Sequence, residues 1–115
     1  MKISFSLVFF LLAAGFAGAQ NMNKISSDYN EAVRLIGEHQ YKEAELKLDK
    51  VIMAKPDYAE AISARGTSRL MQGKRSDACE DFAKAAALGW KAAERSVATY
   101  CGKDAPDDKI NKQQD

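Results

Sequence analysis

Histidine, cysteine and proline are scarce in this chain, and its net charge is close to zero. The 115 residues include one histidine, two cysteines and two prolines, with 17 Lys+Arg against 16 Asp+Glu. So few His and Cys residues provide little material for a metal centre or a Cys–His catalytic pair. A near-neutral chain is a poor partner for a polyanion, so we expect no nucleic-acid binding. The sequence indicates no catalytic residue, no metal and no cofactor, and we expect a protein that is not an enzyme.

Residues 1–19 have the three-part pattern of a secretory signal peptide. Lys2 gives a positive start, Ile3 to Phe16 is an apolar run without charge, and Ala17-Gly18-Ala19 supplies the small residues of a cleavage site. The run is too short to span a bilayer of roughly 30 Å comfortably. The alternative is an uncleaved membrane anchor. We expect cleavage after residue 19, with the mature protein periplasmic or secreted and not inserted in a membrane.

Small and apolar residues repeat with a period of 34 between residues 25 and 90. The matched pairs are Ala32 with Gly66, Ala44 with Ala78, Leu48 with Phe82, and Val51 with Ala85. Within each block they recur at i, i+4, i+7 and i+8, which is the spacing of one helical face. Gly37 to Gln40 and Gly73 are turn signals, and Pro56 ends a helix because it lacks an N–H. Each block is therefore predicted to form two antiparallel helices.

A helix pair repeated at this period resembles the tetratricopeptide repeat family. The matching residues are Ala32, Tyr41, Ala44, Leu48, Val51 and Pro56 in 25–58, and Gly66, Gly73, Ala78, Phe82 and Ala85 in 59–90. The resemblance implies an all-α fold of two tandem helix hairpins after an N-terminal lead-in at 20–24. Residues 91–101, with Ala93, Val97 and Tyr100 on one face, are predicted to form a capping helix. Residues 102–115 are too polar to bury a core and are predicted to be a disordered tail.

Arg65 and Arg69 stand where the repeat family usually has a leucine and an aromatic residue. Arg65 and Asp81 each lie eight residues from Gly73, and residues equidistant from a hairpin turn face each other. We therefore predict an ion pair between Arg65 and Asp81, the alternative being a solvated arginine. The other acidic residues of the first block are predicted to lie on outward helix faces: Glu31, Glu38, Glu43, Glu45 and Asp49. His39, in a polar turn, is expected to be solvated rather than to act as a base.

Cys79 and Cys101 lie symmetrically about residue 90, each eleven residues from it. If residues 78–88 and 91–101 are antiparallel helices, the two cysteines lie side by side. Export to an oxidising compartment then favours a disulfide bond. The alternatives are a redox or metal site, or two free thiols. The absence of a CxxC motif and of a nearby histidine disfavours both a redox site and a metal site.

The repeat family binds a peptide or helix of a partner protein in a groove lined by the first helix of each hairpin. The resemblance implies such a groove here, lined by Tyr29, Val33, Ile36, Ser63, Thr67, Leu70 and Met71. Its apolar composition suits an amphipathic helix or a hydrophobic segment. The Lys and Asn residues of the family's carboxylate clamps are absent from these positions. We expect an adaptor for another envelope or secreted protein, and the alternative is a self-associating homodimer or larger homo-oligomer.

Overall fold

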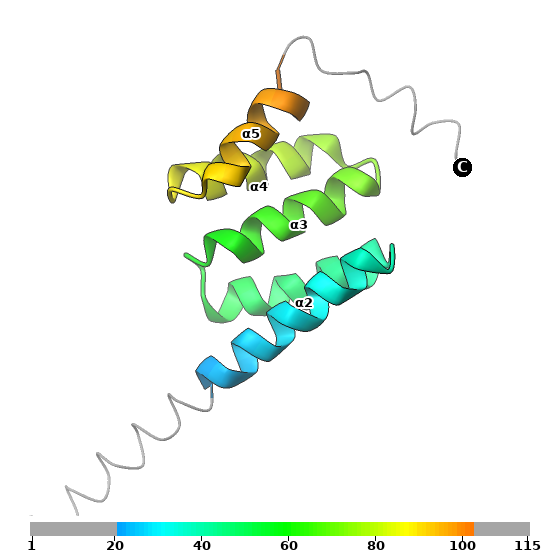
Figure 1. Ribbon diagram of the computed structural model, residues 1–115, viewed down its shortest axis with the longest axis vertical. Coiled ribbons are helices and arrows are strands. Elements are labelled where there is room, and N and C mark those ends of the chain that lie inside the picture. Colours follow the sequence, from blue (N-terminus) through cyan, green and yellow to red (C-terminus); the bar gives the residue numbers. More distant parts are fainter. Residues whose placement is uncertain (1–20, 103–115) are drawn as a thin grey trace, which may run out of the picture.

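A computed structural model describes residues 21–102, and every regular element in this part of the chain is an α-helix. The first helix is described from residue 21 to residue 37, and four more follow it: α2 (Tyr41–Ala54), α3 (Ala59–Met71), α4 (Arg75–Ala87) and α5 (Lys91–Tyr100). Successive helices run back and forth, and each of α2 to α4 packs against the next (Figure 1). The predicted all-α class is confirmed. The proposed signal peptide and residues 103–115 of the proposed tail lie outside the described residues.

The first helix begins earlier than the repeat pattern indicates. Residues 21–24, which the sequence suggested as a lead-in, are already helical. No glycine or proline interrupts Asn21 to Lys24, so nothing in this segment opposes helix formation. At its other end the helix includes Gly37, and the predicted turn is confined to the residues that follow it.

Three helix ends share one turn geometry, in which a residue with positive φ follows the last turn of the helix. These residues are His39 (φ 62°), Gly73 (φ 82°) and Gly89 (φ 95°). At each turn the next backbone N–H reaches back five residues to a carbonyl: Gln40 to Leu35 (2.9 Å), Lys74 to Arg69 (2.9 Å) and Trp90 to Ala85 (3.1 Å). Such bonds satisfy carbonyl groups that a helix end leaves without partners. His39 and Gly73 are separated by one period of the apolar pattern, so the turn repeats together with the core positions.

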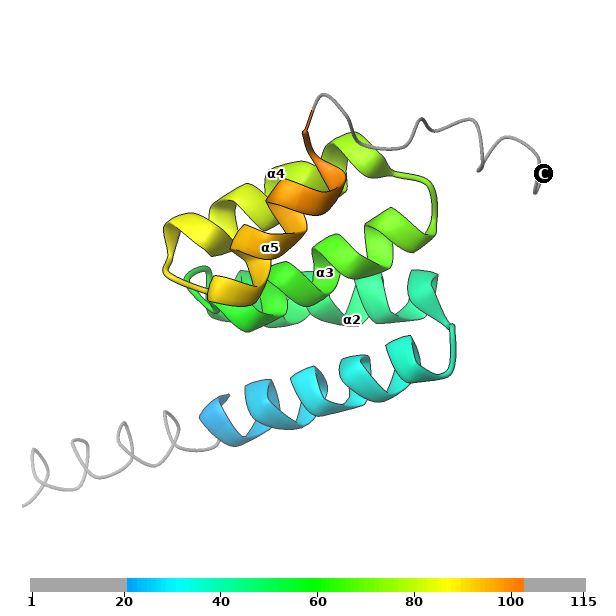
Figure 2. The same ribbon diagram turned by 45° about the horizontal axis from the view of Figure 1, so that its top comes forward.

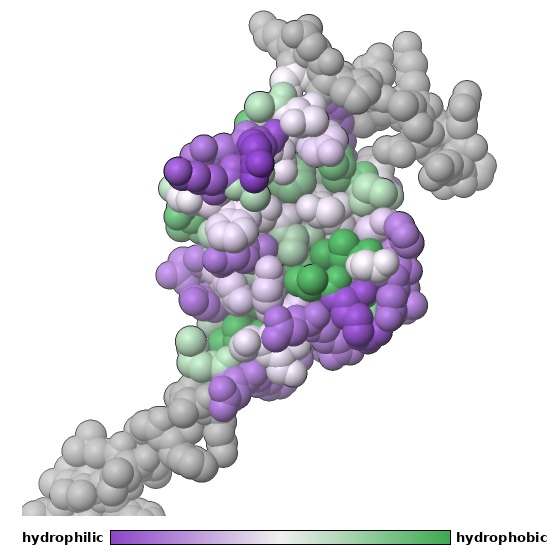
Figure 3. Space-filling model, viewed as in Figure 1, coloured by the Kyte–Doolittle hydropathy of each residue, from purple (hydrophilic) through white to green (hydrophobic). Residues whose placement is uncertain are grey.

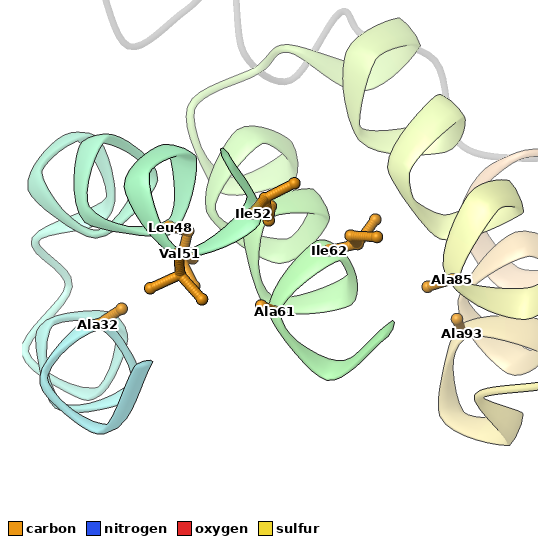
Figure 4. Close-up of a cluster of buried hydrophobic side chains, with 8 residues drawn as sticks. All are labelled: Ala32, Leu48, Val51, Ile52, Ala61, Ile62, Ala85 and Ala93. Carbon is orange, nitrogen blue, oxygen red and sulfur yellow. The ribbon is translucent and has the colours of Figure 1, made fainter. Parts of the chain in front are cut away.

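The core is a row of small and branched side chains that joins all five helices. Ala32 of the first helix faces Leu48 and Val51 of α2, and Ile62 of α3 lies farther along the row (Figure 4). Ala85 of α4 and Ala93 of α5 lie next to each other at its far end (Figure 4). Alanines at these contacts allow the helix backbones to approach closely. The paired residues of the repeating pattern are therefore core residues in both hairpins.

Gly66 lies at a tight contact between α3 and α4. A Cβ atom at residue 66 would lie 2.8 Å from Cε1 and 2.9 Å from Cδ1 of the Phe82 ring, and 3.2 Å from the Ala78 carbonyl oxygen. Phe82 is buried, so a shift of its ring would disturb the side chains packed around it. Gly37, in contrast, has no atom within 4 Å of an added Cβ.

We predict that Gly66→Ala destabilises the protein, while the matched variant Gly37→Ala does not. Alanine favours a helix over glycine by about 1 kcal/mol, and overpacking a core costs typically about 1–3 kcal/mol. Chemical denaturation of both variants measures the difference. Equal changes in the free energy of unfolding would contradict the close approach at Gly66.

Candidate functional site

Asp81 is the centre of an ion-pair network between helices. It is 4% exposed and accepts hydrogen bonds from Arg65 Nε (3.0 Å) and Arg65 Nη2 (2.9 Å). Arg69 Nη1 donates a third bond, at 3.0 Å. The structure therefore brings Arg65 and Asp81 together, in the two-pronged geometry that makes arginine–carboxylate pairs strong. Bonding to Asp81 raises the pKa of Arg65 despite its burial, so the guanidinium group stays charged.

Glu45 is the second buried carboxylate, and its predicted outward position is wrong. It is 8% exposed and accepts bonds from Arg69 Nε (2.8 Å), Lys74 Nζ (2.8 Å) and Gln72 Nε2 (3.1 Å). Burial alone would raise the pKa of Glu45, but the bonds from Lys74, Arg69 and Gln72 outweigh it and lower the pKa to about 2. Glu45 faces inward because α3 packs against the side of α2 that an isolated hairpin would leave in solvent.

The network is balanced in charge and spans three helices. Arg65 Nη1 also donates to Asp49 of α2 at 3.0 Å, and the Asp49 side chain is 42% exposed, in line with its predicted outward position. Three cations (Arg65, Arg69 and Lys74) thus meet three carboxylates (Glu45, Asp49 and Asp81). Within residues 21–102 no buried side-chain nitrogen or oxygen lacks a hydrogen-bond partner. All three carboxylates are held by cations of the chain itself, so this cluster is structural.

The spacing of Arg65 and Arg69 in the sequence indicates the larger ion-pair network, but the prediction from hairpin symmetry covers Arg65 alone. Arg69 follows Arg65 by four residues and therefore lies on the same helix face. Two guanidinium groups on one buried face need more than one carboxylate, and Asp81 alone cannot satisfy both. The missing partners come from α2, which precedes the hairpin.

We predict that Asp81→Ala destabilises the protein by about 3–5 kcal/mol, because it leaves two partly buried arginines without a carboxylate between them. Glu38→Ala is the matched control. Glu38 also pairs with an arginine (Arg34, 2.7 Å), but both side chains are largely exposed, and the loss should be much smaller. Thermal and urea unfolding measure both changes. A similar, small change in the two variants would contradict the structural role of Asp81.

We also predict an acid-dependent loss of stability that Glu45 causes. Its folded-state pKa of about 2 lies below the ordinary 4.5, so its stabilisation is complete above about pH 5 and is lost as the pH falls toward 2. At neutral pH this corresponds to roughly 3 kcal/mol. Glu45→Gln should flatten the dependence between pH 5 and 2, and Glu43→Gln on the same helix should not. Unfolding free energies measured across this range would refute the assignment if both variants followed the wild-type curve.

The disulfide between Cys79 and Cys101 is confirmed. It joins α4 to the residue after α5, with the two Cα atoms 5.7 Å apart. The two half-cystines close a loop of 22 residues, for which the chain-entropy model gives roughly 3 kcal/mol of stabilisation. Residues 21–102 contain no other cysteine.

The seven residues predicted to line a groove differ in what they present to solvent. Val33 is 45% exposed and Met71 is 53% exposed, so these two side chains offer a partner apolar contact area. The others are less accessible: Tyr29, Ile36, Thr67 and Leu70 are partly buried, and Ser63 is buried. Ser63 is thus better described as a core residue, and its carbonyl accepts the Thr67 hydroxyl at 3.3 Å.

Tyr29 packs against another aromatic ring of the chain. Its ring lies 5.0 Å from that of Tyr58, which immediately precedes α3. Tyr29 and Ile36 also pack against the core. The accessible apolar surface is therefore greatest toward the C-terminal ends of the first helix and of α3. Figure 3 shows an apolar patch over this end of the first helix, with hydrophilic side chains around it.

A separate cavity of about 350 Å³ lies between the first helix and the end of α2. Its lining includes Lys24, Ile25 and Asp28 on one side and Lys50, Val51 and Ala54 on the other. Val33 is nine residues from Lys24, which places the two on opposite sides of the helix. The cavity is therefore distinct from the apolar face that carries Val33.

Comparison with models of known protein families, with curated proteins and with solved structures found no match. No helix within residues 21–102 has the length and hydropathy that a bilayer span requires.

Proposed function

We propose that the five helices are two tetratricopeptide-like repeats followed by a capping helix. Helices α2 and α4 begin one sequence period apart, at Tyr41 and Arg75, and the turns before them contain His39 and Gly73 in the same left-handed backbone region. Leu48 and Phe82, separated by the same period, are both fully buried. A common spacing of helix starts, turns and core residues supports a duplicated hairpin better than a periodic sequence alone does.

On this basis the protein is a non-enzymatic adaptor that holds a peptide or helix of another envelope or secreted protein. The observation that carries the proposal is the exposure of Val33 and Met71, on the first helices of the two proposed repeats. Ile36 and Leu70, partly buried, extend the apolar surface beside them. An amphipathic helix or a hydrophobic segment fits such a face, because it removes apolar side chains of both partners from water.

The proposal includes export of the protein from the cytosol. The N-terminal residues have the pattern of a cleaved signal peptide, and a disulfide bond is typical of proteins that leave the reducing cytosol. The partner would then be sought among periplasmic or secreted proteins.

The test compares charged substitutions at two exposed apolar sites: the proposed groove and a control site outside it. We predict that the Val33→Asp/Met71→Asp variant loses the partners that the wild type captures from the native envelope, because charge on the apolar face must be desolvated. Leu46→Asp is the control, since Leu46 is 57% exposed on α2 and outside the proposed groove. Affinity capture with mass spectrometry identifies the partners, and circular dichroism establishes that each variant is folded.

Recovery of the same partners by both variants would contradict the assignment of the groove. Light scattering tests the alternative of self-association. If the wild type forms dimers that the Val33→Asp/Met71→Asp variant does not form, the face binds a second copy, and the adaptor proposal fails.

A further inference from the structure

Helix α5 is the shortest helix within residues 21–102. It has ten residues, and Ala93 is the only one of them that is buried. An isolated helix shorter than about 12–15 residues is marginal in water. It packs against α4, and the network of α2, α3 and α4 does not reach it. Its helical state therefore depends on how it is attached.

The attachments of α5 are concentrated at its two ends. The short turn at Gly89 joins its start to α4. At its far end, Cys101 is bonded to Cys79, Arg75 Nε donates to the Tyr100 carbonyl oxygen (2.8 Å), and the Tyr100 ring lies 6.4 Å from that of Phe82. The disulfide is the only covalent attachment between α4 and this end of α5. Both half-cystine residues are partly exposed and lie near the surface.

An apolar strip of α4 lies beneath α5. Ala85 meets Ala93 directly (Figure 4), and Phe82 contacts α5 through Tyr100 while its other side faces Gly66. In Figure 1, α5 lies on the side of α4 away from the first helix, and in Figure 2 it passes in front of α4. Removal of α5 would therefore expose Phe82 and Ala85 on α4 without disturbing the ion pairs among α2, α3 and α4.

We propose that the Cys79–Cys101 disulfide is a redox latch that holds α5 closed over this apolar strip of α4. A dithiol reductant transfers two electrons to the disulfide, which becomes two thiols, while the dithiol becomes a disulfide. Without the cross-link α5 detaches and unfolds, and α4 presents a second apolar surface. The strip lies on a different helix from the proposed groove, so the latch does not depend on the groove.

Hydrogen exchange with mass spectrometry tests the latch on the chain from Gln20 to Asp115, oxidised or reduced with dithiothreitol. We expect amides of residues 91–101 to exchange roughly a hundredfold faster in the reduced protein, the factor that corresponds to closing a loop of this length. Amides of α2 and α3 should keep their protection. Reoxidation with oxidised glutathione should restore the slow exchange.

The double variant Cys79→Ser/Cys101→Ser separates reduction from other effects of dithiothreitol. It should show fast exchange at 91–101 without reductant, and no further change with it. Unchanged protection of α5 after reduction would overturn the proposal. Parallel loss of protection in all the helices would also overturn it, because the disulfide would then support the whole fold.

Discussion

Two arginines of α3 share the carboxylates of the helices on either side, and the placement of α2, α3 and α4 depends on this shared pairing. Arg69 bonds Glu45 of α2 and Asp81 of α4 at once, and Arg65 bonds Asp49 and Asp81. An apolar contact would permit small shifts in helix register, whereas arginine–carboxylate bonds are directional. Removal of Asp81 takes one carboxylate from both arginines at once, and each arginine then keeps only its partner on α2.

The apolar contacts complement the ionic ones. Alanine and glycine bring the helices close, as at Gly66, where an added Cβ would lie 2.8 Å from the Phe82 ring. Some large apolar side chains take no part in these contacts and are exposed to solvent, among them Val33 and Met71. Helix α5 is held differently, by one disulfide and few buried contacts. Residues 21–102 thus combine an ion-paired centre, exposed apolar side chains on the first helix and α3, and a last helix that a disulfide bond joins to α4.

Local patterns predict much of this structure. The spacing of Ala44, Leu48 and Val51 locates α2, and the symmetry of Cys79 and Cys101 about residue 90 locates the disulfide. The Arg65–Asp81 pair follows from hairpin symmetry. The prediction that fails depends on contacts between hairpins. The helix pattern places Glu45 outward because nothing within its own hairpin covers it, whereas α3 buries it. Leu35 of the first helix is buried, although the repeating pattern does not include it. A helix period identifies a face only to within about one residue, and tertiary packing decides which side chain is buried.

A double-mutant cycle between Glu45→Gln and Asp81→Asn tests whether the three helices share one ionic network. Glu45 and Asp81 lie on different helices and are linked through Arg69. A shared network predicts that the two changes in unfolding free energy are non-additive by about 0.5–3 kcal/mol. Additivity within about 0.3–0.5 kcal/mol would show that α2 and α4 pair with α3 independently, and would contradict the shared pairing.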